Sequence, residues 1–200
     1  MKDKKEAVNE ELEELEPQEQ EKTKLRDFLE FIAPIVIALI IAMILKTFIF
    51  ANAVIPTGSM LNTIQEGDRV FASKIAYTLH DPERYDIAIF KYPDNENEYF
   101  VKRVIGLPGE TVNIKDGDVY ITDKDGNTEK LRDDFVSPEN KDHYNGTFVV
   151  PENSYFMMGD NRDSSVDSRY WTTTNYVTRD KFIGKVILRY YPLSSFGKVE

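Results

Sequence analysis

Ser59 and Lys102 are the two residues whose types could together support nucleophilic catalysis. Ser59 lies in the short polar segment "IPTGSM", residues 55–60, where Gly58 lets another chain approach the backbone closely. A serine hydroxyl is a poor nucleophile until a neighbouring base takes its proton. Because a serine in such a loop is also typical of an ordinary turn, the interpretation depends on whether the chain supplies a base.

Lys102 is the candidate base, in the segment "YFVKRVIGLPGE" at residues 99–110. Side chains alternate between the two faces of a strand, so Phe100 and Val104 share the face of Lys102. Removal from water disfavours the charged ammonium and lowers the pKa of a lysine, which makes the neutral amine available as a base. The alternative is that Lys102 reaches water from the end of its strand.

A third segment, "MGDNRDSSVDSRYW" at residues 158–171, concentrates acidic, basic and hydroxyl side chains. It departs from an EF-hand calcium loop, because Arg162 stands where an oxygen ligand is expected and Ser165 occupies the glycine position. Two interpretations stay open from the residues alone. One is a cluster of turn residues; the other is a platform in which a hydroxyl orients a base and an Asp–Arg pair holds the loop.

Composition argues against several other chemistries. The chain has 200 residues and no cysteine, which rules out disulfides, a thiolate nucleophile and cysteine zinc sites. Its two histidines, His80 and His143, lie in polar turn-like segments, so a histidine-based serine hydrolase is the weaker alternative. The net charge of −10 argues against a nucleic-acid partner. We expect neither a cofactor nor a metal ion.

One apolar stretch is long enough to span a membrane, and it predicts on which side of the membrane the three segments lie. From Phe31 to Phe50 the only charged residue is Lys46, and a helix of that length spans about 30 Å, the thickness of the hydrocarbon core. The stretch predicts a transmembrane helix over residues 25–50, preceded by a disordered acidic tail over residues 1–24. A cleaved signal peptide is the alternative, against which the long charged tail argues. Basic residues before the stretch place the tail in the cytoplasm and residues 51–200 outside the cell.

The rest of the chain predicts a β-rich domain. Short runs rich in Val, Ile, Tyr and Phe are separated by Pro-Gly, Asp-Gly and similar turns. Residues 122–147 are polar and predict a hairpin followed by a long surface excursion. The expected fold class is therefore mainly β, with a single N-terminal transmembrane helix followed by an extracytoplasmic catalytic β domain over residues 51–200.

The three segments, in this order after an apolar anchor, resemble three conserved boxes of the bacterial type I signal peptidases. The resemblance covers residues 28–192. It implies a serine endopeptidase with a Ser/Lys dyad that removes N-terminal signal peptides from secreted preproteins, cutting after small residues at the first and third positions before the cut. It also implies a single-pass protein of the cell membrane. The expected partners are preproteins and the lipid bilayer, and we expect the protein to be a monomer.

The resemblance further implies a role for each matching residue of the reaction centre. Ser59 is expected to be the nucleophile, and Lys102 the general base that takes its proton. The oxyanion is expected to be held by the backbone N–H of Ser59 and the hydroxyl of Thr57.

Other matching residues are expected to support this centre or to contact substrate. Ser165 is expected to hydrogen-bond the amine of Lys102, with Asp167 and Arg169 as a supporting pair beneath it. The apolar wall of the substrate pocket is expected to comprise Ile55, Met60, Ile64, Phe100 and Val101.

The chain departs from the family pattern at two places beside the boxes. Asn62 stands where the family usually has a proline, and residues 172–175 follow Trp171 where a glycine is usual. Both changes concern the rim of the site rather than the dyad. Two other classes remain alternatives: a membrane-anchored β domain without enzymatic activity, and a self-cleaving repressor, whose related Ser/Lys fold lacks an N-terminal anchor.

Overall fold

The structure, a computed structural model, describes residues 26–199, and the chain divides into two compact units between Lys46 and Thr47. The expected acidic tail over residues 1–24 lies outside the described residues. Among those described, Arg26–Ile49 is the one helix long and apolar enough to cross a membrane, with a mean hydropathy of 2.8. Its last turn, η1 (Leu45–Ile49), is wound as a π-helix. Phe50, which the sequence places in this helix, instead begins strand β1 (Phe50–Val54).

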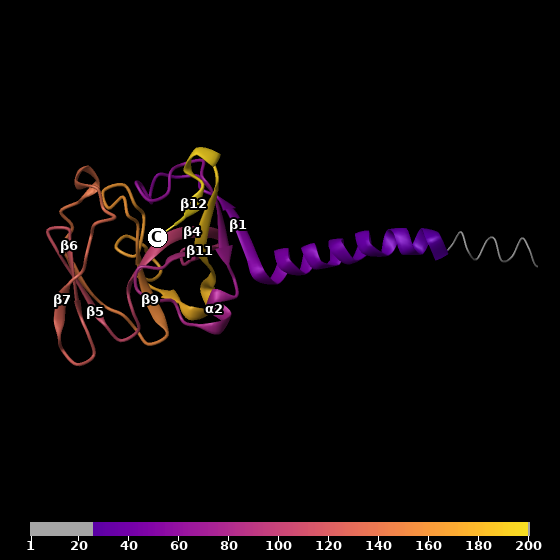
Figure 1. Cartoon of the computed structure of the whole chain (residues 1–200). Helices are drawn as coiled ribbons and strands as arrows, with labels where there is room; N and C mark the ends of the chain where they lie inside the picture. Colours follow the sequence, from indigo (N-terminus) through magenta and orange to yellow (C-terminus); the bar gives the residue numbers. More distant parts are fainter. Residues whose placement is uncertain (1–25, 200) are drawn as a thin grey trace, which may run out of the picture. The chain divides into compact units, whose positions relative to one another are not determined.

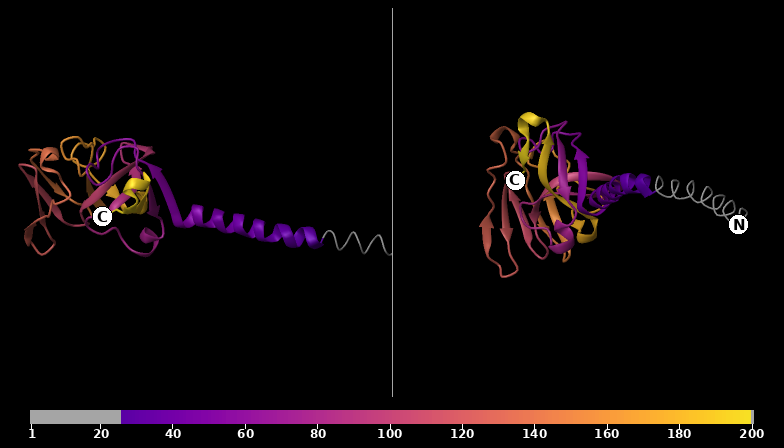
Figure 2. Two further views of the ribbon diagram at one scale, coloured as in Figure 1. Left: turned by 45° about the horizontal axis from the view of Figure 1, so that its top comes forward. Right: turned by 45° about the vertical axis from the view of Figure 1, so that its right-hand side comes forward.

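The second unit is mainly β, as the sequence predicts. Within residues 47–199 it contains an eight-stranded sheet and a four-stranded sheet, which lie beside each other in two of the views (Figures 1 and 2). The large sheet has the order β1-β2-β11-β3-β4-β9-β10, with β12 paired to β11, and the small sheet has the order β7-β6-β5-β8. The paired strands of both sheets within residues 47–199 run antiparallel, so neighbouring strands can be joined by short turns.

The bounds of the elements are as follows. The other strands of the large sheet are β2 (Arg69–Ser73), β3 (Ile87–Tyr92), β4 (Asn95–Gly106), β9 (Ser154–Met158), β10 (Val177–Thr178), β11 (Phe182–Tyr191) and β12 (Gly197–Lys198). The small sheet comprises β5 (Thr111–Lys115), β6 (Asp118–Thr122), β7 (Thr128–Lys130) and β8 (Gly146–Val149). The short helices are α2 (Ala76–Leu79), η2 (Pro138–Asn140), η3 (Arg179–Lys181) and η4 (Leu193–Ser195).

The long strand β4 carries Lys102 into the middle of the large sheet. Lys102 pairs with Ala88 of β3, and the next residue pairs with Met158 of β9, so the lysine is flanked by strands on both sides. Val104 and Phe100 pack in one apolar cluster, whereas Val101 packs in another. This is the alternation that the sequence predicts for the strand. The position excludes the alternative that Lys102 reaches water from a strand end, since its exposed fraction is only 4%.

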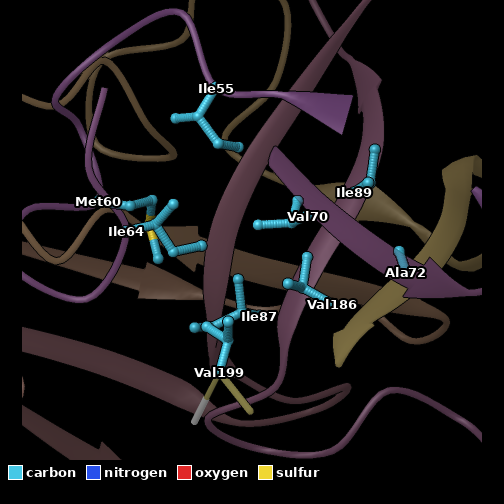
Figure 3. Packing of buried hydrophobic residues seen from close by; sticks show 9 residues of the cluster. All are labelled: Ile55, Met60, Ile64, Val70, Ala72, Ile87, Ile89, Val186 and Val199. Atoms are coloured by element: carbon cyan, nitrogen blue, oxygen red, sulfur yellow. The ribbon is translucent and has the colours of Figure 1, made fainter. Parts of the chain in front are cut away.

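Three apolar clusters form the core of the second unit. The first lies between the large sheet and the loop after β1 and is drawn in Figure 3: Ile55, Met60, Ile64, Val70, Ala72, Ile87, Ile89, Val186 and Val199. The second cluster is rich in aromatic residues and contains Phe90, Tyr155 and Trp171. The third joins the two sheets, because it combines Ile105 of β4 and Phe156 of β9 with residues of β5 and β6.

Gly106 marks the place where β4 leaves the large sheet for the small one. A Cβ atom at this position would lie 2.5 Å from Val112 Cγ2 and 3.0 Å from both Phe156 Cβ and Val150 Cγ2. Real side chains do not approach so closely, so only glycine lets the two sheets meet here. The small sheet, and the surface excursion that leaves it, are therefore fixed to the strand that carries Lys102.

Gly106→Val should destabilise the fold through this crowded junction. Overpacking of a well-packed core typically costs about 1–3 kcal/mol, and the loss should be measured as a lower urea midpoint of unfolding at unchanged slope. Gly197→Val is the matched control, because nothing lies within 4 Å of a Cβ at Gly197. Equal midpoints for the two variants would contradict the close approach of the sheets.

Candidate active site

Ser59 lies in the β1–β2 loop, residues 55–68, which is closed by backbone hydrogen bonds at its base. Ile55 N–H donates to the carbonyl of Asp68 at 2.9 Å, and Gly67 N–H donates to the carbonyl of Ile55 at 2.8 Å. Met60 and Ile64 point from the loop into the first apolar cluster (Figure 3). The apolar residues on either side of the serine therefore fix the loop to the core.

Lys102 and Ser59, 43 positions apart in the chain, meet at hydrogen-bond distance. Lys102 Nζ lies 2.7 Å from Ser59 Oγ. The two residues are 4% and 8% exposed, so their contact is shielded from bulk water. The structure thus brings together the two residues that the sequence singles out for nucleophilic chemistry.

The surroundings of Lys102 favour its neutral form. Burial lowers the pKa of the Lys102 amine from its ordinary value of 10.5 to about 8, and the positive charge of Arg169 acts in the same direction. The carboxylates of Asp167 and Asp160 oppose the shift. The Phe100 ring, with its centroid 5.1 Å from Nζ, covers the amine from one side. A lysine with this pKa can exchange a proton with Ser59 near neutral pH.

Arg103, on the opposite face of β4 from Lys102, forms a buried ion pair with Asp160. Arg103 Nε and Nη2 donate to the two carboxylate oxygens at 2.9 and 2.7 Å. Thr63 Oγ1 donates to the same carboxylate at 2.5 Å. This pair therefore ties the β1–β2 loop, strand β4 and the β9–β10 loop (residues 159–176) to one another.

The β9–β10 loop holds the backbone of the serine. Asn161 N–H donates to the carbonyl of Ser59 at 3.1 Å, and Asn161 Nδ2 donates to the carbonyl of Gly58 at 3.0 Å. Gly159 lies so close that a Cβ there would be 2.4 Å from the Ser59 carbonyl oxygen and 2.2 Å from Ser165 Oγ. A side chain at position 159 would therefore displace either the backbone of Ser59 or the side chain of Ser165.

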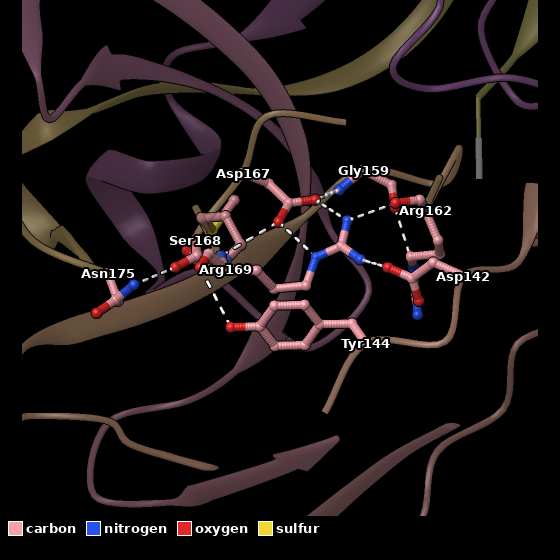
Figure 4. Close-up of polar contacts among 9 residues, drawn as sticks. Asp142, Tyr144, Gly159, Arg162, Asp167, Ser168, Arg169 and Asn175 are labelled. Atoms are coloured by element: carbon pink, nitrogen blue, oxygen red, sulfur yellow. Dashed lines mark hydrogen bonds and ion pairs between the residues drawn. The ribbon is translucent and has the colours of Figure 1, made fainter. Parts of the chain in front are cut away.

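Asp167 and Arg169 form the expected pair, which Figure 4 shows. Arg169 Nε and Nη2 donate to the two oxygens of Asp167, both at 2.8 Å. Asp167 Oδ2 also accepts a hydrogen bond from Gly159 N–H at 2.9 Å. Both side chains are fully buried, and the bidentate geometry is the strong form of an Arg–carboxylate contact.

Ser165 does not make the hydrogen bond that the sequence analysis expects. Its Oγ is buried, but among residues 26–199 it has no hydrogen-bond partner, so the expected contact with the Lys102 amine is wrong for this structure. The Lys102 amine contacts Ser59 Oγ instead, at 2.7 Å. Ser165 nevertheless lies beside Gly159 and the Ser59 carbonyl.

The other predicted reaction-centre residue, Thr57, lies beside the serine, whereas the two histidines do not. Thr57 Oγ1 is 3.4 Å from Ser59 Oγ, and its side chain is exposed. His143 is on the surface, where its Nδ1 contacts Asp116 at 2.5 Å, and its side chain is 87% exposed. His80 is exposed beyond the end of α2. Neither histidine is therefore placed to serve as the base for Ser59.

The predicted apolar wall divides into two groups. Ile55, Met60 and Ile64 are at most 3% exposed and belong to the first core cluster. Phe100 and Val101, in contrast, are half-buried and retain surface that a ligand could contact. Ile55, Met60 and Ile64 therefore hold the serine loop against the core. The accessible apolar surface beside Ser59 and Lys102 comes from Phe100 and Val101 of β4.

The sequence does not predict several contacts around Ser59 and Lys102. Gly159, Asp160 and Asn161 belong to the polar segment of residues 158–171, but their contacts with Ser59 and Arg103 can be recognised only in the folded structure. Asp142 contacts Arg169 Nη1 from the surface excursion, and nothing in its sequence context indicates this. Among residues 26–199, no group of three or more His, Asp or Glu side chains is arranged to hold a metal ion.

Comparisons with known proteins identify the family. A family model described as "Signal peptidase, peptidase S26" matches residues 28–191. The chain is 36% identical to the probable signal peptidase I-2 of Synechocystis over 85% of this chain and 76% of the relative. It is 32% identical to signal peptidase I S of Bacillus subtilis over 88% of this chain and 96% of that protein.

Among solved structures, a signal peptidase I from Enterococcus faecalis is 34% identical, with a TM-score of 0.44, over 53% of this chain and 97% of that chain. The match of the family model over most of the sequence, together with these relatives, shows that the chain belongs to the signal peptidase family, peptidase S26.

Proposed function

We propose that this serine endopeptidase removes N-terminal signal peptides from secreted preproteins, with Ser59 as nucleophile and Lys102 as general base. Family membership supports the reaction class and substrate class. The single observation that carries the residue assignment is the 2.7 Å contact between Lys102 Nζ and Ser59 Oγ in a buried environment. An anchored β domain without activity would have no need for this costly arrangement, because a buried lysine must give up its hydration.

The reaction follows from the protonation state of Lys102. With a pKa of about 8, roughly one amine in ten is neutral at pH 7. The neutral amine takes the proton of Ser59 Oγ while this oxygen attacks the carbonyl carbon of the scissile bond. The resulting ammonium gives its proton to the leaving amine, which forms the acyl-enzyme and frees the mature protein. Lys102 then takes a proton from the attacking water and returns it to Ser59 Oγ as the acyl bond breaks, which releases the signal peptide and restores the free enzyme.

The developing oxyanion would be held by the backbone N–H of Ser59 and the hydroxyl of Thr57. The support for Thr57 is its place beside the nucleophile, with 3.4 Å between its Oγ1 and Ser59 Oγ. Because its side chain is exposed, the hydroxyl is free to turn toward a bound substrate. Such preorganised donors stabilise the transition state more than the ground state.

Three further residues support the dyad in this proposal. Asp167 and Arg169 hold the loop that contacts the Ser59 backbone. Ser165 lies beside Gly159 and the Ser59 carbonyl, so its side chain would support the position of Ser59 by packing.

Substrate would contact the accessible surface of Phe100 and Val101. The buried residues Ile55, Met60 and Ile64 would support this surface by packing beneath it. An extended peptide presents alternate side chains on the same face, so the first and third residues before the cut would enter neighbouring pockets.

The helix Arg26–Ile49 supports membrane anchoring. It precedes β1 directly, so the catalytic domain of residues 51–200 would be tethered close to the bilayer. We propose a single-pass topology with residues 1–24 as a cytoplasmic tail and the catalytic domain outside, because basic residues precede the helix. The tether would raise the local concentration of membrane-bound preproteins. Since Ser59 and Lys102 come from one chain, a monomer suffices for this chemistry.

Ser59→Ala and Lys102→Met should each abolish processing of a preprotein by the full-length enzyme in detergent. The methionine keeps the volume of the lysine stem but lacks the amine. Because the two residues act as one unit, the double variant should be no slower than either single variant. Ser164→Ala and Lys91→Met are matched controls outside the site and should cleave at the wild-type rate. Retention of most activity by Lys102→Met would refute the Ser/Lys assignment.

Thr57→Val should lower turnover about a hundredfold or more, because loss of one oxyanion donor costs on the order of 3 kcal/mol in the transition state. Thr57→Ser keeps the hydroxyl and should stay close to wild type. The measurement is kcat on a synthetic signal-peptide substrate for both variants. Equal kcat for Thr57→Val and wild type would remove Thr57 from the mechanism.

The pH dependence should follow Lys102. The neutral amine is the active form, so kcat/KM should rise with pH through about 8 and reach a plateau below the ordinary lysine value of 10.5. Phe100→Ser should admit water and move the rising limb to higher pH, because burial is the largest cause of the shift. His80→Ala and His143→Ala should leave the profile unchanged. A rising limb that disappears in either histidine variant would contradict the lysine mechanism.

A further inference from the structure

The surface excursion between β7 and β8, residues 131–145, which we call the strap, extends from the small sheet to the loops around the dyad. The Phe135 ring lies over two buried arginines, with its centroid 4.1 Å from Arg103 Cζ and 5.8 Å from Arg162 Cζ. The carbonyl of Asn140 accepts a hydrogen bond from Asp163 N–H at 3.0 Å. The strap is thus attached to both β4 and the β9–β10 loop.

Asp142 makes the deepest polar contact of the strap. Its Oδ2 pairs with Arg169 Nη1, and the two side chains are 10% and 0% exposed (Figure 4). Asp142 Oδ1 is buried and has no hydrogen-bond partner among the described residues. Tyr144, two residues further on, places its ring 5.8 Å from Arg169 Cζ. A carboxylate is therefore held in a largely dry position, where its main compensation is the arginine.

From Arg169 a continuous series of contacts leads to the nucleophile. Arg169 binds both oxygens of Asp167 at 2.8 Å, and Asp167 accepts the N–H of Gly159 at 2.9 Å. A Cβ at Gly159 would lie only 2.4 Å from the Ser59 carbonyl oxygen, so this residue is packed directly on the serine backbone. A shift of Arg169 would therefore be transmitted to Ser59 through groups that have no free space.

The charges of this cluster balance only when Asp142 is included. Arg103 is compensated by Asp160, which leaves Arg162 and Arg169 beside Asp167 and Asp142. Arg162 is 3% exposed and donates from Nε to the carbonyl of Gly159 at 3.0 Å. Without Asp142, two buried arginines would share one carboxylate next to Lys102. Removal of one partner from a buried ion pair leaves an uncompensated charge and is strongly unfavourable.

We propose that Asp142 is a positioning residue for catalysis, which holds Arg169 and through it the loop that packs on Ser59. The inference rests on the proposed function of the Ser59–Lys102 pair. Asp142 touches neither member of that pair and neither of the residues assigned to the substrate surface. Its contribution is to the rate of the chemical step rather than to substrate binding, because small displacements of a reacting group are costly even when they arise far from it.

The test compares Asp142→Asn and Asp133→Asn in the full-length enzyme, with a synthetic signal-peptide substrate in detergent. Asp142→Asn keeps the shape of the side chain and removes its charge. We expect kcat to fall about 10- to 100-fold with KM close to wild type. Asp133→Asn is the matched control from the same strap, since Asp133 pairs with Lys141 at the surface, and it should behave as wild type. Asp142→Glu restores the carboxylate and should have a kcat between wild type and Asp142→Asn.

Near-ultraviolet circular dichroism at the assay temperature separates this role from a loss of folded protein. A wild-type kcat for folded Asp142→Asn, or a loss of kcat no larger than the loss of folded enzyme, would overturn the proposal. If Asp142→Asn does not fold, the folded Asp142→Glu must still show a reduced kcat at wild-type KM, and a wild-type kcat would overturn it. Ser59→Ala and Lys102→Met in the same assay distinguish a failure of the proposed function from a failure of the positioning role. Activity in these two variants would refute the proposed function. If they are inactive and Asp142→Asn has wild-type activity, only the positioning role of Asp142 is refuted.

Discussion

The hydrogen bond between Lys102 and Ser59 depends on keeping an amine away from water. In water a lysine is charged at neutral pH and has no lone pair to offer a hydroxyl proton. Lys102 lies on an interior strand, between β3 and β9 and under the Phe100 ring, and this burial disfavours the charged form of its amine. Much of the surrounding architecture can be understood as what is needed to keep this strand covered and the serine loop against it.

The polar groups around the dyad show how such a site is stabilised. Arg103 and Asp160, and Arg169 and Asp167, are almost completely buried, and each pair is bidentate. Buried ion pairs of this kind contribute less to stability than to the choice of one arrangement among several, because desolvation offsets much of their attraction. The Arg103–Asp160 pair, with Thr63, fixes the relative positions of the serine loop, β4 and the β9–β10 loop, three segments that are far apart in the chain. The Asp167–Arg169 pair lies within the β9–β10 loop and holds that loop at Gly159.

The sequence predicted the strand alternation around Lys102 and the mainly β class, because both depend on local patterns of apolar residues. It did not predict β1, since the apolar run of the preceding helix continues into Phe50, nor β2, which is short and polar at its ends. The Asp167–Arg169 contact was foreseeable because the two residues are neighbours in one loop. Asp142 was not, because its partner lies 27 positions away and the choice among many acidic residues is made by packing. The direction of the Lys102 amine toward Ser59 rather than Ser165 likewise depends on tertiary geometry.

The strap belongs to the periphery of the molecule, and this has a consequence for how the protein responds to heat. Its residues are mostly exposed or half-buried, and β7, which precedes it, has three residues, all exposed. Segments with few buried contacts open at a lower free energy than the strands of a core. The strap can therefore open while the large sheet stays folded. Local opening of the strap would interrupt turnover transiently in molecules whose strand β4 is still folded. The upper limit of the working temperature would then be set by the stability of the strap and not by the stability of the large sheet.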